Sequence, residues 1–384
     1  MLWGFLRQDG QVGIRNYLLI ISSVVCANRV TELIAQAVPG AIPITHQHGC
    51  AQIGEDMEIV FRTLEGTGKN PNVGAVLVVG LGCESVNAEE LAIKISKSNK
   101  MVDCVSIQKV GGTAKAIEEG IKKAKKMLQE LKVIKREPFG WEKIILGTEC
   151  GGSDTTSGIA ANPAVGRVAD RIVKLGGTVI LSETTEIIGA EHILAKRAVT
   201  NELGERLIDL IKRVEERYSK LGVDFRGGNP APGNVEGGIT TLEEKSLGAI
   251  HKAGTSIFQE ILDYAQKPSK KGLVIMDTPG HDVESMTGMV AGGCQVILFT
   301  TGRGTPTGHP ICPVIKITGN PQTWEKMQDD IDINASPIVL GEKTLDEIGE
   351  EIFKYLIDVI NGKLAKAEVM GHREFGITRI SMSL

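Results

Sequence analysis

Residues 144–154 read IILGTECGGSD, and from this short stretch the fold class can be inferred. An apolar run, Ile144 to Leu146, is followed at once by two carboxylates, a thiol, a hydroxyl and paired glycines. Open α/β sheets bind their ligands beyond the carboxyl ends of buried strands, where such polar loops begin. We therefore interpret this stretch as a strand that ends at a candidate active site.

The same arrangement recurs at three other places in the chain, each a short apolar run followed by polar or metal-ligating side chains. These are Ala41 to Ile44 before His46 and Cys50, Ala75 to Val79 before Cys83 and Glu84, and Thr178 to Leu181 before Glu183 and Glu186. Because the carboxyl ends of parallel strands meet at one edge of a sheet, these loops predict an assembled active site.

Short apolar runs alternate with longer amphipathic segments along the whole chain, a pattern typical of βαβ units. The predicted strands are Tyr17 to Val24, Ala41 to Thr45, Ala75 to Val79, Asp103 to Ile107, Lys143 to Leu146, Thr178 to Leu181, Leu273 to Met276, Val296 to Thr300 and Val314 to Thr318. The clearest predicted helices are Lys115 to Leu131, Val199 to Leu221 and Leu345 to Ile360. Uninterrupted apolar strands indicate burial on both faces. The predicted fold is therefore α/β, with two Rossmann-like domains and mostly parallel sheets.

The length of 384 residues favours two domains over one core. The charged, Pro/Gly-containing stretch 135–140 is interpreted as a linker, which divides the chain into an N-terminal α/β domain, 1–137, and a C-terminal α/β domain, 138–384. Residues 226–238 are too rich in glycine and proline for a predicted helix or central strand. They are interpreted either as a connector or as a lid over a ligand.

The composition of the chain argues against some classes of binding partner. The 43 basic and 47 acidic side chains nearly balance and no basic block is present, which argues against nucleic acid or a membrane surface as the partner and favours a small molecule. No apolar run reaches the roughly 20 residues of a membrane span, and the start lacks the order of a signal peptide. Seven cysteines without paired spacing suit a reducing compartment. We expect a cytoplasmic protein with free thiols.

Two familiar nucleotide-binding patterns are incomplete. Residues 277–280, Asp-Thr-Pro-Gly, resemble the magnesium-side motif of GTPases, but the sequence has no GxxxxGK[ST] loop. Residues 80–85 depart from GxGxxG at the last glycine. A hydroxyl and a guanidinium in the stretch 300–304 are better suited to a carboxylate, and Arg303 is either a carboxylate ligand or a solvated loop residue.

Each candidate residue also has a plain structural interpretation. A buried histidine such as His46 is often a hydrogen-bonded core residue, although two imidazoles and a thiol within five residues favour a metal or acid–base role. Cys83 is equally well a small buried hydrophobe. Glu183 and Glu186 are equally well solvated carboxylates. For Cys150 the adjacent glycines favour a functional role, because they let backbone amides approach an anion.

Beyond these local arguments, the motifs resemble those of one family in order and nearly from end to end. The stretches that carry the resemblance are 7–17, 45–50, 80–84, 150–154, 182–186, 229–234, 276–280 and 299–304. They are similar to those of the altronate/galactarate dehydratase family. That family also includes the large subunit of (2R)-sulfolactate sulfo-lyase, so the resemblance defines the chemistry better than the substrate.

The resemblance implies a metal-dependent lyase that dehydrates a sugar acid such as altronate to a 2-keto-3-deoxy acid. It implies a divalent metal, with Fe²⁺ first and Mn²⁺ as the alternative. A base removes the C2 proton and an acid assists the leaving hydroxide. The predicted catalytic residues are His46, Glu84, Asp154 and Glu183, the metal ligands are Cys50, Cys83 and Cys150, and the substrate-binding residues are Arg15, Asn16, Ser153, Thr301 and Arg303.

The resemblance also implies a partner. Full-length members begin with a small β-rich domain, whereas this chain opens almost directly on Arg7, so we expect a separate small β-rich subunit, with a homo-oligomer of the large one. Three alternatives stay open: a sulfo-lyase large subunit that releases sulfite, a non-catalytic subunit that binds hydroxy acids, and an iron–sulfur dehydratase. Against the last, the cysteines lie in separate motifs and not in a cluster-type run.

Overall fold

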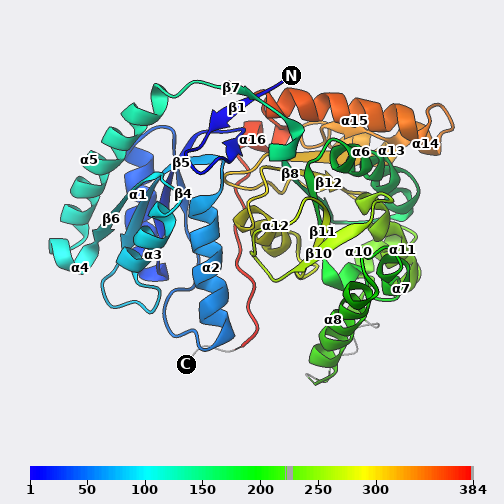
Figure 1. Cartoon of the computed structure of the whole chain (residues 1–384), viewed down its shortest axis with the longest axis horizontal. Helices are drawn as coiled ribbons and strands as arrows, with labels where there is room; N and C mark the ends of the chain where they lie inside the picture. Colours follow the sequence, from blue (N-terminus) through cyan, green and yellow to red (C-terminus); the bar gives the residue numbers. More distant parts are fainter. Residues whose placement is uncertain (221, 223–227, 382–384) are drawn as a thin grey trace.

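The computed structural model describes residues 1–220, 222 and 228–381, and these form two parallel sheets that lie side by side (Figure 1). The sheet of the N-terminal half has the strand order β4-β3-β5-β6, and all of its neighbours are parallel. Its strands are β3 (Tyr17–Ser22), β4 (Ala41–Ile44), β5 (Val73–Gly80) and β6 (Met101–Ser106). Every residue of β5 is buried, as its uninterrupted apolar sequence predicts.

The sheet of the C-terminal half is larger, with the order β10-β11-β9-β8-β12-β13-β14 and parallel pairing throughout. Its strands are β8 (Ile145–Cys150), β9 (Thr178–Leu181), β10 (Phe258–Leu262), β11 (Gly272–Met276), β12 (Val296–Thr300), β13 (Val314–Thr318) and β14 (Ile333–Asn334). All nine strands predicted from the sequence are present, and the predicted fold of α/β type with mostly parallel sheets is confirmed.

Helices cover the faces of both sheets (Figure 1). In the N-terminal half they are α1 (Asn28–Ala37), α2 (Glu55–Lys69), α3 (Ala88–Ser96), α4 (Ile107–Val110) and α5 (Thr113–Lys132). In the C-terminal half they are α6 (Asn162–Lys174), α7 (Glu191–Ala195), α8 (Asn201–Lys220), α10 (Pro232–Glu236), α11 (Leu242–Ile250), α12 (Asp282–Ala291), α13 (Pro321–Lys326), α14 (Ser336–Val339), α15 (Leu345–Ile360) and α16 (Lys366–Met370). Short helical turns also occur at Val25–Ala27, Trp141–Lys143, Ser157–Ala161, Thr184–Glu186 and His251–Ala253.

Two stretches differ from the sequence interpretation. The predicted linker 135–140 contains a strand, β7 (Glu137–Phe139), which pairs with β1 (Leu2–Leu6) in a small antiparallel sheet completed by β2 (Val12–Gly13). Within 226–238, predicted to hold no helix, α10 forms one short turn of helix because Pro232 occupies its first position. Residues 226–227 of this stretch lie outside the described residues. The domain division at residue 137 stays a prediction.

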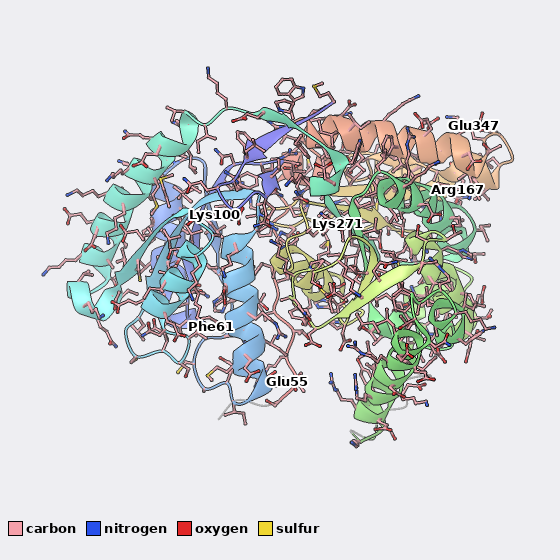
Figure 2. The ribbon with its side chains drawn as sticks, in the orientation of Figure 1. Glu55, Phe61, Lys100, Arg167, Lys271 and Glu347 are labelled. Atoms are coloured by element: carbon pink, nitrogen blue, oxygen red, sulfur yellow. The ribbon has the colours of Figure 1, made fainter. Side chains whose placement is uncertain are left out.

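A hydrophobic core joins the two halves. It combines β3 and β5 side chains such as Leu19 and Val76 with Ile297 and Phe299 of β12, and α2 packs against α12 between the sheets. Side chains fill this region in Figure 2, where Glu55 marks the start of α2. Because apolar surface from both halves is buried in one core, the halves are held in a fixed arrangement.

The chain after α16 runs between the halves (Figure 1) and connects the two central helices. The Gly376 N–H donates to Thr287 of α12, and the Ile380 N–H donates to the Asp56 carboxylate of α2. Among the described residues, no helix is both long and apolar enough to cross a bilayer.

The strand order predicts one crevice at the carboxyl end of each parallel sheet. In the larger sheet, β9 and β12 lie on opposite sides of β8, so the chain reverses direction between β8 and β12. In the smaller sheet, the corresponding reversal lies between β3 and β5. Loops that leave neighbouring strands in opposite directions open a crevice beyond the carboxyl ends, which is the usual ligand site of such sheets.

Candidate active site

Three carboxylates meet at the carboxyl end of the larger sheet. Glu149 lies in β8, Glu183 is the second residue after β9, and Asp282 is the first residue of α12. One carboxylate oxygen from each residue lies within 4.8 Å of the others, and Glu149 and Glu183 are fully buried. We call this group the acid triad.

Only one of the two Glu149 carboxylate oxygens is hydrogen-bonded within the described part of the chain. Its Oε2 accepts hydrogen bonds from Ser182 Oγ (3.1 Å) and Ser285 Oγ (2.7 Å). Its Oε1 is buried and has no hydrogen-bond partner within the described part of the chain. Because buried oxygens are nearly always paired, an unpaired oxygen on a carboxylate that lies close to two others fits a cation.

Glu183 is held in a strained backbone conformation. Its φ of 65° is left-handed, which costs a non-glycine residue about 1–3 kcal/mol. Its N–H donates to Thr278 Oγ1 (2.7 Å), which connects the end of β9 to the end of β11. Its Oε2 accepts the Cys150 N–H at 3.0 Å. The strained turn thereby places this carboxylate beside Cys150 and the other two carboxylates of the acid triad.

Lys252 is the cation beside this group. It lies in the helical turn after α11, and its side chain is 1% exposed. Its Nζ lies 2.6 Å from Glu183 Oε2 and donates to Cys150 Sγ at 3.1 Å. Burial lowers the pKa of Lys252, but the neighbouring Cys150, Glu183 and Glu149 raise it more, so the ammonium stays charged.

Burial and the neighbouring negative charges both raise the pKa values of carboxylates at this site. They raise the pKa of Glu149 well above its usual range, with Glu183 and Asp282 as the charges concerned. They raise the pKa of Asp282 to about 7, mainly through burial and through Glu183. Burial is the larger cause of both shifts, and the neighbouring carboxylates add to it. A divalent cation would take the place of the protons that such carboxyl groups otherwise hold, so the donor set fits a metal.

A cavity of about 310 Å³ opens beside the triad at the β8/β12 crevice. It is lined by Cys150, Gly151, Gly152, Ser153, Glu186, Ala231, Gly233, Asn234, Lys245, Gly280, Asp282 and Arg303. Lys245 is paired with the buried Glu186 at 3.1 Å, whereas Arg303 is paired at 3.0 Å with the exposed Glu236. The cavity thus combines an acidic wall with two cations, a surface suited to a small hydroxylated acid.

Comparison with known sequences identifies this architecture. Residues 141–383 match the profile of the D-galactarate/altronate dehydratase C-terminal domain, and residues 4–132 match that of the D-galactarate dehydratase/altronate hydrolase second domain. The chain belongs to the galactarate/altronate dehydratase family. The predicted family and its enzyme class of lyases are therefore confirmed.

Relatives within the family have different names. The chain is 36% identical to the (2R)-sulfolactate sulfo-lyase subunit beta of Chromohalobacter salexigens, over 98% of this chain and 97% of that protein. It is 35% identical to the altronate dehydratase of Bacillus subtilis, over 99% of this chain and 78% of that protein. It is 37% identical to the galactarate dehydratase (L-threo-forming) of Escherichia coli, over 94% and 72% respectively.

Several residues predicted from the sequence lie at this site of the family fold. Cys150, Ser153 and Arg303 line the cavity, and Glu183 belongs to the acid triad. Asp154 lies behind it, where its carboxylate accepts hydrogen bonds from residues 156, 157 and 320.

The Thr301 hydroxyl accepts the Gly304 N–H, so it shapes the loop that carries Arg303. The roles predicted for Asp154 and Thr301 stay predictions.

A second group of predicted residues lies beyond the smaller sheet. His46 Nε2 is 2.8 Å from the Ser22 carbonyl, and its Nδ1 accepts the His48 N–H, so both ring nitrogens are engaged. Burial lowers the pKa of His46 to about 4. Glu84 accepts a hydrogen bond from Ser23 Oγ at 3.0 Å. None of the contacts described for these residues reaches the acid triad.

The three predicted thiol ligands are divided between the sheets. Cys150 is buried in the larger sheet, whereas Cys50 and Cys83 are exposed beyond the smaller one. Burial raises the pKa of Cys150 well above its usual range, and the Glu183 charge adds to this. The structure therefore does not bring these three sulfurs together as one ligand set.

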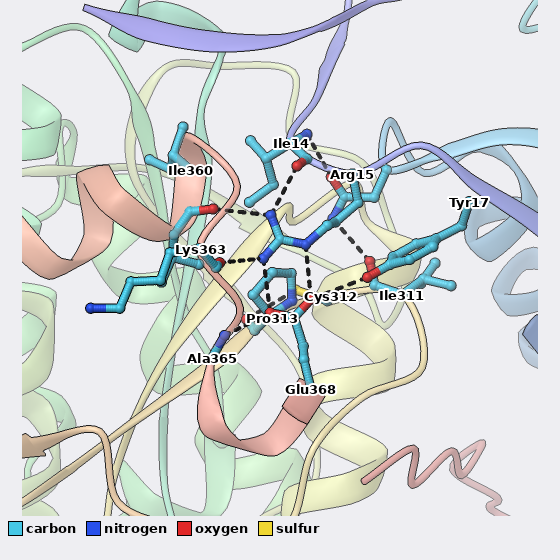
Figure 3. A network of polar contacts seen from close by, with 12 residues as sticks. Ile14, Arg15, Tyr17, Ile311, Cys312, Pro313, Ile360, Lys363, Ala365 and Glu368 are labelled. Atoms are coloured by element: carbon cyan, nitrogen blue, oxygen red, sulfur yellow. Dashed lines mark hydrogen bonds and ion pairs between the residues drawn. The ribbon is translucent and has the colours of Figure 1, made fainter. Parts of the chain in front are cut away.

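Arg15 and Asn16 lie at the opposite end of the smaller sheet, before β3. All five N–H groups of Arg15 are used inside the protein, by Glu368 (twice, at 2.8 Å) and by the carbonyls of residues 14, 359 and 363 (Figure 3). Asn16 accepts from Arg7 and donates to the Leu131 carbonyl. Arg15 thereby joins the two halves, and the substrate-binding roles predicted for Arg15 and Asn16 stay predictions.

Sequence reasoning did not select three residues of the site. Glu149 could have been selected, because a carboxylate inside an apolar strand is unusual. Asp282 has a weaker signal as an acidic residue just after a glycine-containing strand end. Lys252 has none, since it precedes no motif and follows an ordinary amphipathic helix.

Proposed function

We propose that this chain catalyses the metal-dependent dehydration of a sugar acid such as altronate, giving a 2-keto-3-deoxy acid by β-elimination. The observation that carries the proposal is the buried acid triad beside a cavity large enough for a small polyhydroxy acid. Family membership supplies the reaction class, because relatives of 35% and 37% identity are named altronate and galactarate dehydratase.

The acid triad would hold the metal, for which we propose Fe²⁺, with Mn²⁺ as the alternative. A cation bound there would polarise the substrate carboxylate and stabilise the enolate that forms when C2 loses its proton. Three carboxylate oxygens alone suit a hard ion such as Mn²⁺, whereas the adjacent Cys150 sulfur is a softer ligand that suits iron.

Other residues of the chain would orient the ligands and transfer the proton. Lys252 fixes the orientation of Glu183 and so acts as a positioning residue. Glu186 is our candidate for the base: it lines the cavity, and its Oε2 has no hydrogen-bond partner among the described residues. Burial raises the pKa of Glu186, which brings a carboxylate closer to the pH at which it exchanges protons.

Charge in the cavity favours a substrate with one carboxylate. Lys245 is tied to the buried Glu186, with side chains only 12% and 6% exposed. Arg303 is paired with Glu236 at an exposed position, 45% and 66%, where an ion pair contributes little. Arg303 is thus the cation that can be released to bind an anion, which favours an acid such as altronate over a dianion.

We also propose a separate small β-rich subunit as partner. In support, this chain aligns with 97% of a relative that is itself named a subunit. The predicted homo-oligomer and the predicted cytoplasmic location stay predictions. A second candidate function is (2R)-sulfolactate sulfo-lyase activity, which the same relative favours at 36% identity.

One experiment separates these functions. The anaerobically purified chain, loaded with Fe²⁺ or Mn²⁺, is assayed on altronate, galactarate and sulfolactate, with and without the candidate small subunit. We expect a 2-keto-3-deoxy acid from altronate and loss of both metal and activity in Glu149→Gln. Release of sulfite from sulfolactate alone would establish the second function. Binding of hydroxy acids by a metal-free, inactive protein would refute both and indicate a binding subunit.

A further inference from the structure

Two cavities open at the amino ends of the strands, at the edge of the larger sheet opposite to the acid triad. Their volumes are about 400 and 180 Å³. Residues just before β5, β8 and β11 line the smaller one, such as Pro71, Lys143 and Lys271. Asp9 and Lys267 line both cavities, so the two are parts of one groove. The length of the strands therefore separates this groove from the acid triad.

Positive charge dominates the lining of the groove. Among the described residues, its acidic side chains are Asp9 and Glu65. Its cationic side chains are Arg62, Lys69, Lys97, Lys143, Lys267, Lys270 and Lys271. The whole chain has a net charge of −4, so this excess of cations is a local property of one surface. We call the surface formed by these cationic residues the basic groove.

The basic groove is assembled from both halves of the chain. Arg62 and Lys69 lie in α2 and Lys97 directly follows α3, whereas the other cations belong to the C-terminal half. Figure 2 labels one lysine of each half, Lys100 beside the groove and Lys271 within it. The cations are dispersed along the sequence and form no basic block there. The fold alone brings them together, so a ligand in the groove would contact both halves.

Most of these cations have no carboxylate partner inside the protein. Lys69 pairs with Glu65, and within the described part of the chain no other cation of the basic groove forms an ion pair. Lys143 and Lys271 donate to main-chain carbonyls, which carry no net charge. The protein therefore leaves most of this positive charge uncompensated.

The cations also repel one another. Burial lowers the pKa of Lys267, and although Asp9 opposes this shift, the Lys69 charge adds to it. Burial lowers the pKa of Lys100 well below its usual range, and the charges of Lys267 and Lys69 add to that shift. An anion in the groove would offset this repulsion, because an opposite charge favours the protonated form of each lysine.

We propose that the basic groove binds a small polyanion, a molecule that carries at least two phosphate or carboxylate groups. Clefts lined by charge of one sign concentrate ligands of the opposite sign. Lys97 and Lys143 line different cavities of the groove, so cations are available at both ends for two anionic groups. A ligand with one carboxylate, such as the sugar acid proposed as substrate, would neutralise only one of these ends.

This site is independent of the proposed dehydration, because the acid triad lies at the other end of the strands. Its effect would be on the arrangement of the two halves. Lys97 of the N-terminal half and Lys267 of the C-terminal half line the same cavity of about 400 Å³, so one anionic group can contact both. Binding of the polyanion therefore adds a contact between the halves that the chain alone lacks.

Calorimetric titration of the full chain tests the proposal. Pyrophosphate, citrate and acetate are titrated at constant ionic strength without added divalent metal, so that no anion binds through an ion at the acid triad. We expect one site per chain for pyrophosphate, citrate or both, and none for the monoanion acetate. A preference for pyrophosphate identifies a phosphorylated ligand, and a preference for citrate identifies a polycarboxylate.

Single substitutions locate the site. Lys97→Gln and Lys267→Gln, one from each half, should each weaken binding about three- to tenfold. Lys126→Gln, at an exposed lysine of α5, is the matched control and should leave the Kd unchanged. Failure of both pyrophosphate and citrate to bind would overturn the proposal, as would unchanged affinity in both groove variants. An equal loss of affinity in all three variants would also overturn it, because it would indicate diffuse attraction to net charge and not a groove.

Discussion

Replacing Lys252 by methionine is the sharpest test of the electrostatics at the acid triad. The Nζ–Oε2 distance to Glu183 is 2.6 Å, and both side chains are 1% exposed. At an effective dielectric constant of about 20, this separation gives a gross attraction of about 6 kcal/mol. Removing one partner of a buried pair costs about 3–5 kcal/mol, because the other charge is left uncompensated. We expect Lys252→Met to lose that much free energy of unfolding in EDTA.

A divalent cation should reverse the effect. With Lys252 removed, the acid triad has one more uncompensated negative charge, so the variant should bind Mn²⁺ at least about tenfold more tightly, a gain of about 1.4 kcal/mol. Mn²⁺ at about one hundred times its Kd stabilises the folded state by about 2.7 kcal/mol. Saturating Mn²⁺ should therefore recover most of the stability that the substitution removes.

Urea unfolding with EDTA or with Mn²⁺, combined with titration calorimetry, measures both quantities. Lys343→Met is the matched control, because Lys343 pairs with Glu351 at the surface, with exposures of 41% and 45%. That control should change the free energy of unfolding by less than about 1 kcal/mol. If Lys252→Met loses less than about 1 kcal/mol in EDTA, or binds Mn²⁺ no more tightly than wild type, the proposed charge balance is wrong.

The remaining predictions concern three other positions. Glu368→Gln leaves the buried Arg15 guanidinium without its carboxylate and should cost about 3–5 kcal/mol in urea unfolding; a loss under about 1 kcal/mol would contradict this. Gly151→Ala places a Cβ 2.2 Å from Asp282 Oδ2, so Mn²⁺ affinity should fall about 10- to 100-fold in calorimetry. The depressed pKa of His46, about 4, means that stability is fully present above pH 6.5 and is lost by about 3 kcal/mol as pH falls toward 4. His46→Asn should flatten this dependence in unfolding measured between pH 4 and 7.

The strands were predictable because their sequences are continuous apolar runs. Residues 178–181, 296–300 and 314–318 form strands with the predicted bounds, since buried parallel strands need no polar alternation. The short strands β1 and β7 were not predicted: β1 is apolar but lies alone at the start of the chain, and β7 is only three residues long, Glu-Pro-Phe. They pair only with each other and with β2. Their stability comes from tertiary pairing, which a local pattern does not contain.

The candidate site was predictable only in part, because strand-end motifs identify loops but not the sheet to which each loop belongs. The motifs of Cys150 and Glu183 lie on adjacent strands of the larger sheet, whereas those of His46 and Cys83 lie on the smaller one. In the sequence, all four motifs look alike, because each is an apolar run followed by polar or metal-ligating side chains. Strand order alone determines which of them can meet.

The two sheet ends therefore differ in chemistry as well as in place. The larger sheet gathers carboxylates, which are hard oxygen ligands, in a buried position. The smaller sheet gathers thiols, which are soft ligands, at an exposed position. Ligand softness selects metals by type, so the two sets of ligands prefer different classes of ion. The division predicts that Mn²⁺ binds at the acid triad without these thiols: Cys50→Ser and Cys83→Ser should each leave the affinity for Mn²⁺ unchanged in titration calorimetry, and a loss of about tenfold or more in either variant would contradict it.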